Sequence, residues 1–292
     1  MIEILKAILI GIVEGITEWL PISSTGHMIL VNEFVELDVS SSFLSVFLVV
    51  IQLGAIMAVI VLYFNRLNPF DNKKSQRERQ STLAIWQKVV VASIPAAIIG
   101  VLFDDWVDEH FHSTLIIAIA LIIYGFAFLL VERMQGEVRQ PRHMRRSRAG
   151  ENQNEELDNL TMTQALGIGL FQCLAIVPGT SRSGATILGG RILGVSRRSS
   201  AEFSFFMAIP VMFGWSLLKV IKELVFGALA VTATEWAVLI VGSLVAFVVS
   251  LLTIRFLIGY VQKNSFRVFG YYRIALGIIV IVYFAVTGSL LS

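Results

Sequence analysis

The sequence predicts an all-α polytopic membrane protein with six transmembrane helices and two re-entrant helix–loop–helix hairpins in an inverted-topology repeat. Its 292 residues are 56% hydrophobic and only 15% charged, with a mean hydropathy of +0.77. Soluble domains carry about 45–50% apolar and about 25% charged residues. Several apolar runs also reach the roughly 20 residues that span the hydrocarbon of a bilayer. We therefore expect one membrane domain, residues 1–292.

Six apolar stretches are long enough to be full spans, and two further regions are interrupted. The expected spans are residues 43–64, 83–103, 114–132, 203–225, 235–257 and 271–291. Residues 4–37 and 162–196 each contain a short apolar helix, a break rich in Pro, Ser and Gly, and a second short helix. Proline interrupts helical hydrogen bonding, and glycine permits a turn. Because non-helical backbone at membrane depth survives only inside protein or beside a water-filled cavity, we expect two re-entrant hairpins.

The charged residues of the loops predict the orientation in the membrane. Lys and Arg concentrate in the expected loops 65–82, 133–161 and 258–270, whereas the expected loop 104–113 is acidic. Basic loops stay in the cytoplasm, so both termini and the opening of the first hairpin should lie outside. Because the basic residues sit in these loops, the net charge of +2 does not indicate a nucleic-acid partner. The segment 133–161 is expected to be a solvated linker.

The two interrupted regions form an internal repeat. When the chain is shifted so that Ser23 falls on Ser181, Gly26 also falls on Gly184, Gly11 on Gly169 and Glu14 on Gln172. Each half, residues 1–132 and 162–292, then contains one hairpin and three spans. An odd number of crossings inverts the second half relative to the first, and such repeats place polar sites where the halves meet. We expect the two breaks to meet near the middle of the membrane.

Two carboxylates lie in the first interrupted region. Glu14 and Glu18 are four positions apart and share one face of a helix. Ionised carboxylates inside a membrane protein are costly unless a cation or an arginine offsets them. One interpretation pairs them with Arg182 in a purely structural role. The other is a divalent cation site, because Mg²⁺ is commonly held by one or two carboxylates plus substrate phosphates.

The first break also carries a histidine and two serines. His27 follows Ser23 and Ser24 closely and lies on the same hairpin as the glutamates, which favours a role as general acid or base. The serines are also typical caps of the helix that follows. Capping is compatible with function, because the N-terminus of that helix, with Thr25 and Gly26, can bind an anion.

The second break contains Arg182 between Ser181 and Ser183. A buried arginine at a helix start offers a planar fork of donors that suits phosphate oxygens. Together with the amides of Ser183 and Gly184 it would form a phosphate cradle. These groups, enclosed by apolar helices, suit phosphoryl transfer or hydrolysis on a lipid-linked phosphate. The single cysteine, Cys173, excludes an intramolecular disulfide.

Two long motifs carry a resemblance to a known family. EGITEWLPISSTGH (residues 14–27) and PGTSRSGAT (178–186) resemble the signature motifs of the bacterial undecaprenyl-diphosphate phosphatases, the bacitracin-resistance proteins, and AEFSFFMAIP (201–210) also fits. The resemblance covers essentially the whole chain. It implies hydrolysis of undecaprenyl diphosphate to undecaprenyl phosphate, which recycles the lipid carrier for peptidoglycan synthesis in the bacterial plasma membrane.

The resemblance also implies roles for individual residues. Ser24, His27, Glu18 and Arg182 would be catalytic, and Glu14 and Glu18 would hold Mg²⁺ or Ca²⁺. The expected phosphate-binding residues are Ser23, Thr25, Gly26, Ser181, Arg182, Ser183 and Gly184. The expected partners are the polyprenyl diphosphate and membrane lipids, and a homo-oligomer is compatible with the sequence. An active site on the first hairpin should be reached from the outer face.

Two mechanisms and two other functions stay open at this point. Ser24 could attack the terminal phosphorus while His27 removes its proton. In the other mechanism water attacks with His27 as its base, and Ser24 only binds phosphate. Inverted repeats with broken helices are also typical of secondary transporters, so a flippase of a lipid phosphate is the main alternative. The glutamate pair and the Ser/His couple argue against it, since transport does not require them. A structural scaffold leaves the charges inside the membrane unexplained.

Overall fold

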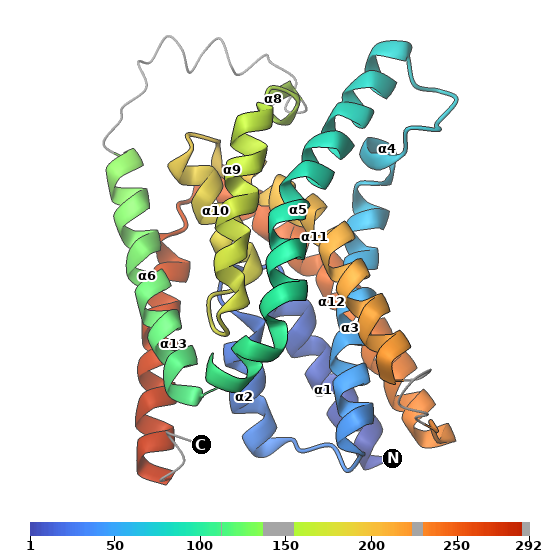
Figure 1. The fold of residues 1–292 in the computed structure, drawn as a ribbon, viewed down its shortest axis with the longest axis vertical. Helices are drawn as coiled ribbons and strands as arrows, with labels where there is room; N and C mark the ends of the chain where they lie inside the picture. The colour runs from blue at the N-terminus through green and yellow to red at the C-terminus, as the bar shows by residue number, and fades with distance from the viewer. Residues whose placement is uncertain (112, 137–154, 224–229, 288–292) are drawn as a thin grey trace.

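The computed structural model describes residues 1–111, 113–136, 155–223 and 230–287, and within these residues the regular structure is entirely helical (Figure 1). Six helices in this part of the chain are long and apolar enough to cross a membrane. They are α3 (Ser41–Leu62), α5 (Gln76–Phe111), α6 (Thr114–Gly136), α11 (Arg197–Ile221), α12 (Ala233–Lys263) and α13 (Arg267–Thr287). The prediction of a multi-pass helical membrane protein with six spans is confirmed.

The prediction that residues 104–113 form a loop is wrong, because α5 continues to Phe111. The side chain of Val107 is buried, and the ring of Trp106 stacks on that of His110 one turn later, with centroids 4.9 Å apart. These contacts extend the helix beyond its apolar stretch. Helix also replaces part of the expected loops 65–82 and 258–270, since α5 begins at Gln76 and only residues 264–266 separate α12 from α13. Most of the expected linker 133–161 lies outside the described residues.

Two pairs of short helices replace spans where the sequence is interrupted. The first pair is α1 (Ile2–Thr17) and α2 (Ser24–Phe34); the second is α9 (Met162–Cys173) and α10 (Arg182–Ile192), with the 3₁₀ turn η1 (Leu174–Ile176) after α9. The first pair opens toward the end of the molecule where α1 begins and α13 ends, and the second opens toward the opposite end, beside the short helix α8 (Glu155–Asp158) (Figure 1). The turns of both pairs lie in the middle of the molecule.

Glycines bring the short helices close to long helices of the other half of the chain. A Cβ added at Gly11 of α1 would lie 2.6 Å from the carbonyl oxygen of Gly242 in α12. A Cβ added at Gly169 of α9 would lie 2.1 Å from the carbonyl oxygen of Ala92 in α5. Small residues let helix backbones approach closely inside membranes. Each pair of short helices is therefore packed against a long helix from the opposite half of the chain.

The centre of the molecule is buried and its flanks are apolar. Trp19, just after α1, is fully buried and meets Phe205 of α11 edge to face, with ring centroids 5.3 Å apart. Large apolar side chains on the outer faces of the spans, such as Ile98, Ile123 and Leu244, are about half exposed. Extensive exposed apolar surface marks a region of contact with lipid or protein. Here it covers the six spans, as expected for helices in a bilayer.

Candidate active site

The two breaks share an unusual backbone conformation at one equivalent position. Ser23 has φ 74° and ψ 103°, and Ser181 has φ 70° and ψ 120°. Among the described residues these are the only non-glycine residues with positive φ. The left-handed region is unfavourable for residues with a Cβ, and residues held there cluster at functional sites. The two strained positions are those that the predicted repeat aligns with each other.

Ser23 and Ser181 cap the helices that follow them. The hydroxyl of Ser23 accepts a hydrogen bond from the amide of Gly26 (3.3 Å), and the hydroxyl of Ser181 accepts one from the amide of Gly184 (3.1 Å). The capping interpretation is therefore correct for Ser23, whereas Ser24 is the first residue of α2. The first amides of a helix have no partner inside the helix. An anion at the starts of α2 and α10 would therefore meet the amides of their first two residues, because those of Gly26 and Gly184 are bonded by the caps.

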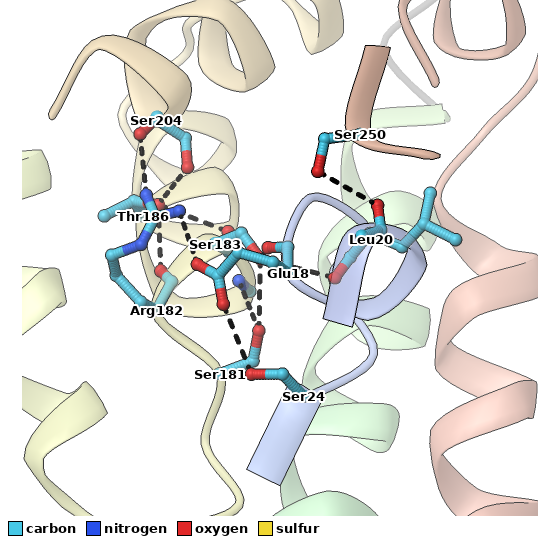
Figure 2. Close-up of polar contacts among 11 residues, drawn as sticks. Glu18, Leu20, Ser24, Ser181, Arg182, Ser183, Thr186, Ser204 and Ser250 are labelled. Atoms are coloured by element: carbon cyan, nitrogen blue, oxygen red, sulfur yellow. Dashed lines mark hydrogen bonds and ion pairs between the residues drawn. The ribbon is translucent and has the colours of Figure 1, made fainter. Parts of the chain in front are cut away.

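Polar contacts join the two breaks directly. The Ser183 hydroxyl lies within hydrogen-bonding distance of the carbonyl oxygens of Glu18 (3.0 Å) and Leu20 (3.3 Å), at the end of α1 (Figure 2). The carbonyls of Glu18 and Leu20 follow the end of α1, so they accept no hydrogen bond from an amide within that helix. Ser183 thus brings the first turn of α10 against the first break, as the expected meeting of the breaks requires.

The carboxylate of Glu18 connects Ser24 to Arg182 across the two halves. Nη2 of Arg182 lies 2.9 Å from Oε1 of Glu18, and the Ser24 hydroxyl donates to Oε2 at 3.2 Å (Figure 2). Nη1 of Arg182 donates to the carbonyl of Ser204 in α11 at 2.8 Å, and its guanidinium lies 5.9 Å from the ring centre of Trp19. The Glu18–Arg182 pair is largely buried. The expected ion pair with Arg182 is therefore present for Glu18, and it does not by itself decide between a structural and a catalytic role.

Glu14 differs from Glu18 in having no ion-pair partner among the described residues. Its side chain is 2% exposed, and within this part of the chain its Oε1 forms no hydrogen bond. An unpaired buried carboxylate is costly, and a bound cation would offset that cost. Within the described residues, no three His, Cys, Asp or Glu side chains are grouped so as to hold a metal alone. The two carboxylates nevertheless fit a hard cation that takes its remaining ligands from phosphate and water, as Mg²⁺ often does.

His27 is held by groups other than Ser24. Its Nδ1 lies 2.7 Å from the carbonyl oxygen of Ser23, and its Nε2 lies 2.7 Å from the hydroxyl of Tyr272 in α13. Because a carbonyl can only accept, Nδ1 carries the hydrogen and Nε2 of the neutral ring accepts from Tyr272. Among the described residues, no hydrogen bond joins His27 to Ser24. The expected Ser24–His27 couple is thus not formed in this structure.

Sequence reasoning missed two neighbouring residues of α13. Tyr272 contacts His27, and Arg273 is fully buried and donates to carbonyls of both breaks. An arginine inside an apolar span is itself a signal of a functional site. This signal was overlooked because Arg273 lies near the expected start of the last span, where a positive residue is ordinary.

A cavity adjoins the first break on its apolar side. It has a volume of about 280 Å³ and lies among α1, α2, α3 and α6. Thr25 and Thr114 contribute hydroxyls, and the rest of its lining consists of aliphatic and methionine side chains. Thr25 is exposed, whereas its neighbour Ser23 is buried. The polar break therefore meets a space suited to an apolar chain.

Comparison with known proteins finds relatives that match nearly the whole chain. The family model for "Bacitracin resistance protein BacA" matches residues 7–279. Undecaprenyl-diphosphatase 1 of Clostridioides difficile is 50% identical to the chain, and the match covers 97% of both proteins. The undecaprenyl-diphosphatase of Enterococcus faecalis is 52% identical, and the match covers 95% of this chain and 96% of the relative. That of Streptococcus mutans is also 52% identical, and the match covers 96% of both proteins.

Proposed function

This chain belongs to the bacitracin resistance protein BacA family, and we propose that it is an undecaprenyl-diphosphate phosphatase. It hydrolyses undecaprenyl diphosphate to undecaprenyl phosphate and inorganic phosphate. Relatives with about half of their residues identical are named for this activity, and they match nearly the whole chain. The reaction recycles the lipid carrier of peptidoglycan synthesis and confers resistance to bacitracin.

The link from Ser24 through Glu18 to Arg182 is the single observation that carries the proposal. It brings together a hydroxyl, a proton acceptor and a phosphate-binding cation from two distant parts of the chain. Phosphoryl transfer depends mainly on positioning and on stabilisation of the phosphoryl oxygens. The adjoining apolar cavity suits the part of a polyprenyl chain nearest the diphosphate.

Ser24 is the proposed nucleophile, and Glu18 is the group placed to take its proton. The Ser24 oxygen attacks the terminal phosphorus, its proton passes to Oε2 of Glu18, and the bond from phosphorus to the bridging oxygen breaks. Undecaprenyl phosphate leaves with that oxygen. Water then attacks the phosphoserine, which releases phosphate and restores Ser24. In the alternative, water attacks the substrate directly with His27 as its base, and Ser24 only binds the phosphate.

Arg182 is the proposed clamp for the terminal phosphate. A phosphate oxygen competes with Glu18 for Nη2, so binding of substrate loosens the ion pair and frees Oε1 of Glu18. The planar fork of arginine suits two phosphate oxygens and stabilises the charge that develops during transfer. The open amides at the starts of α2 and α10 add donors to the same anion.

Glu14 and Glu18 are the proposed ligands of a divalent cation. The buried, unpartnered Oε1 of Glu14 supports this assignment. Mg²⁺ or Ca²⁺, when bound, would offset the charge of the diphosphate oxygens.

We further propose that the two helix pairs are re-entrant hairpins of an inverted-topology repeat. The matching strain at Ser23 and Ser181 supports the repeat, as do the equivalent close contacts of Gly11 and Gly169. The pairs open toward opposite ends of the molecule (Figure 1). With the basic loops in the cytoplasm, the first hairpin opens outward, so Ser24 and His27 are reached from the outer face.

Release of phosphate tests the proposed function. The purified protein in detergent should release inorganic phosphate from undecaprenyl diphosphate, and EDTA should reduce the rate. Ser24→Ala should abolish release. A protein that instead moves the labelled lipid across proteoliposomes without releasing phosphate would be a flippase, and the proposal would be wrong.

A further inference from the structure

Arg273 connects the two breaks from a third element. Its Nη1 donates to the carbonyl of Pro21 in the first break at 3.2 Å. Its Nη2 donates to the carbonyls of Gly179 and Thr180 in the second break, at 2.8 and 2.9 Å. The side chain is fully buried. One guanidinium from α13 thus holds the backbone of both breaks at the point where they meet.

The charge of Arg273 is not neutralised by a carboxylate. Within the described residues its polar partners are the three carbonyls, and its Nε forms no hydrogen bond. The ring of Tyr124 lies 5.5 Å from the guanidinium carbon and offers only a cation–π contact. A buried charge without a counterion is costly, since carbonyl dipoles replace its hydration only in part.

The position of Arg273 makes this cost larger when no anion is present. A Cβ added at Gly184, in the first turn of α10, would lie 3.1 Å from Nη1 of Arg273. The N-terminus of a helix carries a partial positive charge, which disfavours a cation and favours an anion. Arg182, at the start of the same helix, is a second cation, and it is already paired with Glu18. An anion bound between the two helix starts would offset the unpaired charge.

We propose that Arg273 is a positioning residue for the diphosphate of the substrate, and that it acts in two ways. Its charge adds to the positive potential at the starts of α2 and α10, which strengthens anion binding. Its fork fixes the carbonyls of both breaks, so that Ser24 and Arg182 face the same phosphorus. The inference rests on the proposed phosphatase function, and it assigns to α13 a part in a site otherwise built from the two hairpins.

Two substitutions separate charge from geometry. Arg273→Met removes the positive charge and the three hydrogen bonds to the carbonyls. Arg273→Lys keeps the charge, but its ammonium group cannot hold three carbonyls as a planar guanidinium does. Arg255→Met is the matched control, because Arg255 lies on the neighbouring span α12 and its side chain is exposed. For each purified variant we would measure the melting temperature, the affinity for inorganic diphosphate by calorimetry, and kcat and KM for phosphate release.

The expected pattern differs between the variants. Arg273→Met should bind inorganic diphosphate about tenfold more weakly and lose about 100-fold in kcat/KM, because both contributions disappear. Arg273→Lys should keep its affinity for diphosphate within about threefold and still lose about tenfold in kcat, because only the geometry is disturbed. A purely structural arginine would not separate affinity from turnover in this way. Arg255→Met should match the wild-type protein in all three measurements.

Several results would overturn the inference. Wild-type diphosphate affinity in folded Arg273→Met would exclude the role of the charge. Wild-type kcat in Arg273→Lys would exclude the role in positioning. If Arg273→Met does not fold, the kcat of Arg273→Lys alone tests the inference. If the wild-type protein binds diphosphate but releases no phosphate from the lipid substrate, the proposed function fails, while the affinity comparison still tests the charge of Arg273.

Discussion

The hydroxyl of Tyr272 lies 2.7 Å from Nε2 of His27, and the two rings stack with their centroids 5.6 Å apart and their planes within 5°. The other ring nitrogen, Nδ1, forms a hydrogen bond with the carbonyl oxygen of Ser23. The imidazole is therefore held in one tautomer and one orientation, by a residue from the last helix of the chain. Hydrogen bonds of this kind set which nitrogen of a catalytic histidine can exchange a proton.

Tyr272→Phe is expected to reduce turnover about tenfold, because it removes the donor to Nε2 and leaves the ring stacking in place. Phosphate release by Tyr272→Phe, His27→Ala and the double variant forms a double-mutant cycle. We expect the loss in the double variant to be smaller than the two single losses combined. Tyr271→Phe, at an exposed neighbouring position, is the control. Fully additive losses would mean that Tyr272 does not act through His27.

Arg182→Lys should remain strongly impaired, with a loss of about 100-fold or more in kcat/KM. The two terminal nitrogens of Arg182 serve Glu18 and the carbonyl of Ser204 separately, and a single ammonium cannot reproduce this fork. Arg191→Lys, the same change near the far end of α10, should stay within about threefold of wild type in kcat/KM, because Arg191 pairs with Glu132 and not with a group of the site. Near wild-type turnover in Arg182→Ala would refute the assignment of Arg182 as the phosphate clamp.

Glu14→Gln and Glu18→Gln should both weaken the response of the activity to added Mg²⁺. The amide keeps the size of the side chain but removes the charge that a hard cation prefers. Glu14→Gln should raise the half-maximal Mg²⁺ concentration by about tenfold or more without loss of folded protein, because Oε1 of Glu14 has no hydrogen bond to lose. Glu235→Gln, at the cap of α12, serves as control. An unchanged Mg²⁺ titration in both variants would show that these residues are not the cation site.

Gly169→Ala should lower the stability of the protein in detergent by about 1–3 kcal/mol, because the new methyl group would overlap the backbone of α5. Gly100→Ala, in α5 itself, meets nothing within 4 Å and should be neutral or slightly stabilising. Thermal unfolding of both variants would measure the difference. Equal melting temperatures would contradict the close contact between the second hairpin and the first half of the chain.

Cysteine labelling tests the proposed orientation. In a Cys173→Ala background, a membrane-impermeant thiol reagent applied to intact spheroplasts should label Ser41→Cys and spare Asn72→Cys. Ser41 is the first residue of α3, at the end of the molecule where α1 begins (Figure 1). Asn72 lies between the short helix α4 (Phe64–Leu67) and α5, in the basic segment 65–82 that is expected in the cytoplasm. Permeabilised cells should label both positions, which controls for reactivity. The reverse pattern in intact cells would overturn both the topology and the outward-facing site.

Local properties of the sequence determined the class of protein and the position of the two breaks that form the candidate site. Apolar runs of sufficient length indicate spans wherever they fold, because the backbone must satisfy its own hydrogen bonds in lipid. The two breaks were predictable for the same reason, since Pro, Ser and Gly interrupt helices through their own backbone properties. Ser24, Glu18 and Arg182 therefore stood out before their contacts were known. Helix ends were less predictable, as α5 shows, because the packing of Val107 and Trp106 extends the helix.

Only the tertiary structure decided which groups act together. Ser24 and His27 are close in sequence, yet the hydroxyl donates to Glu18 while the ring turns to Tyr272, 245 residues away in the chain. The Arg182–Glu18 pair and the contacts of Arg273 likewise join distant segments. The direction in which a side chain points depends on the backbone angles at each break and on the helices packed around it. Those helices come from both halves of the chain, so no stretch of sequence contains the information alone.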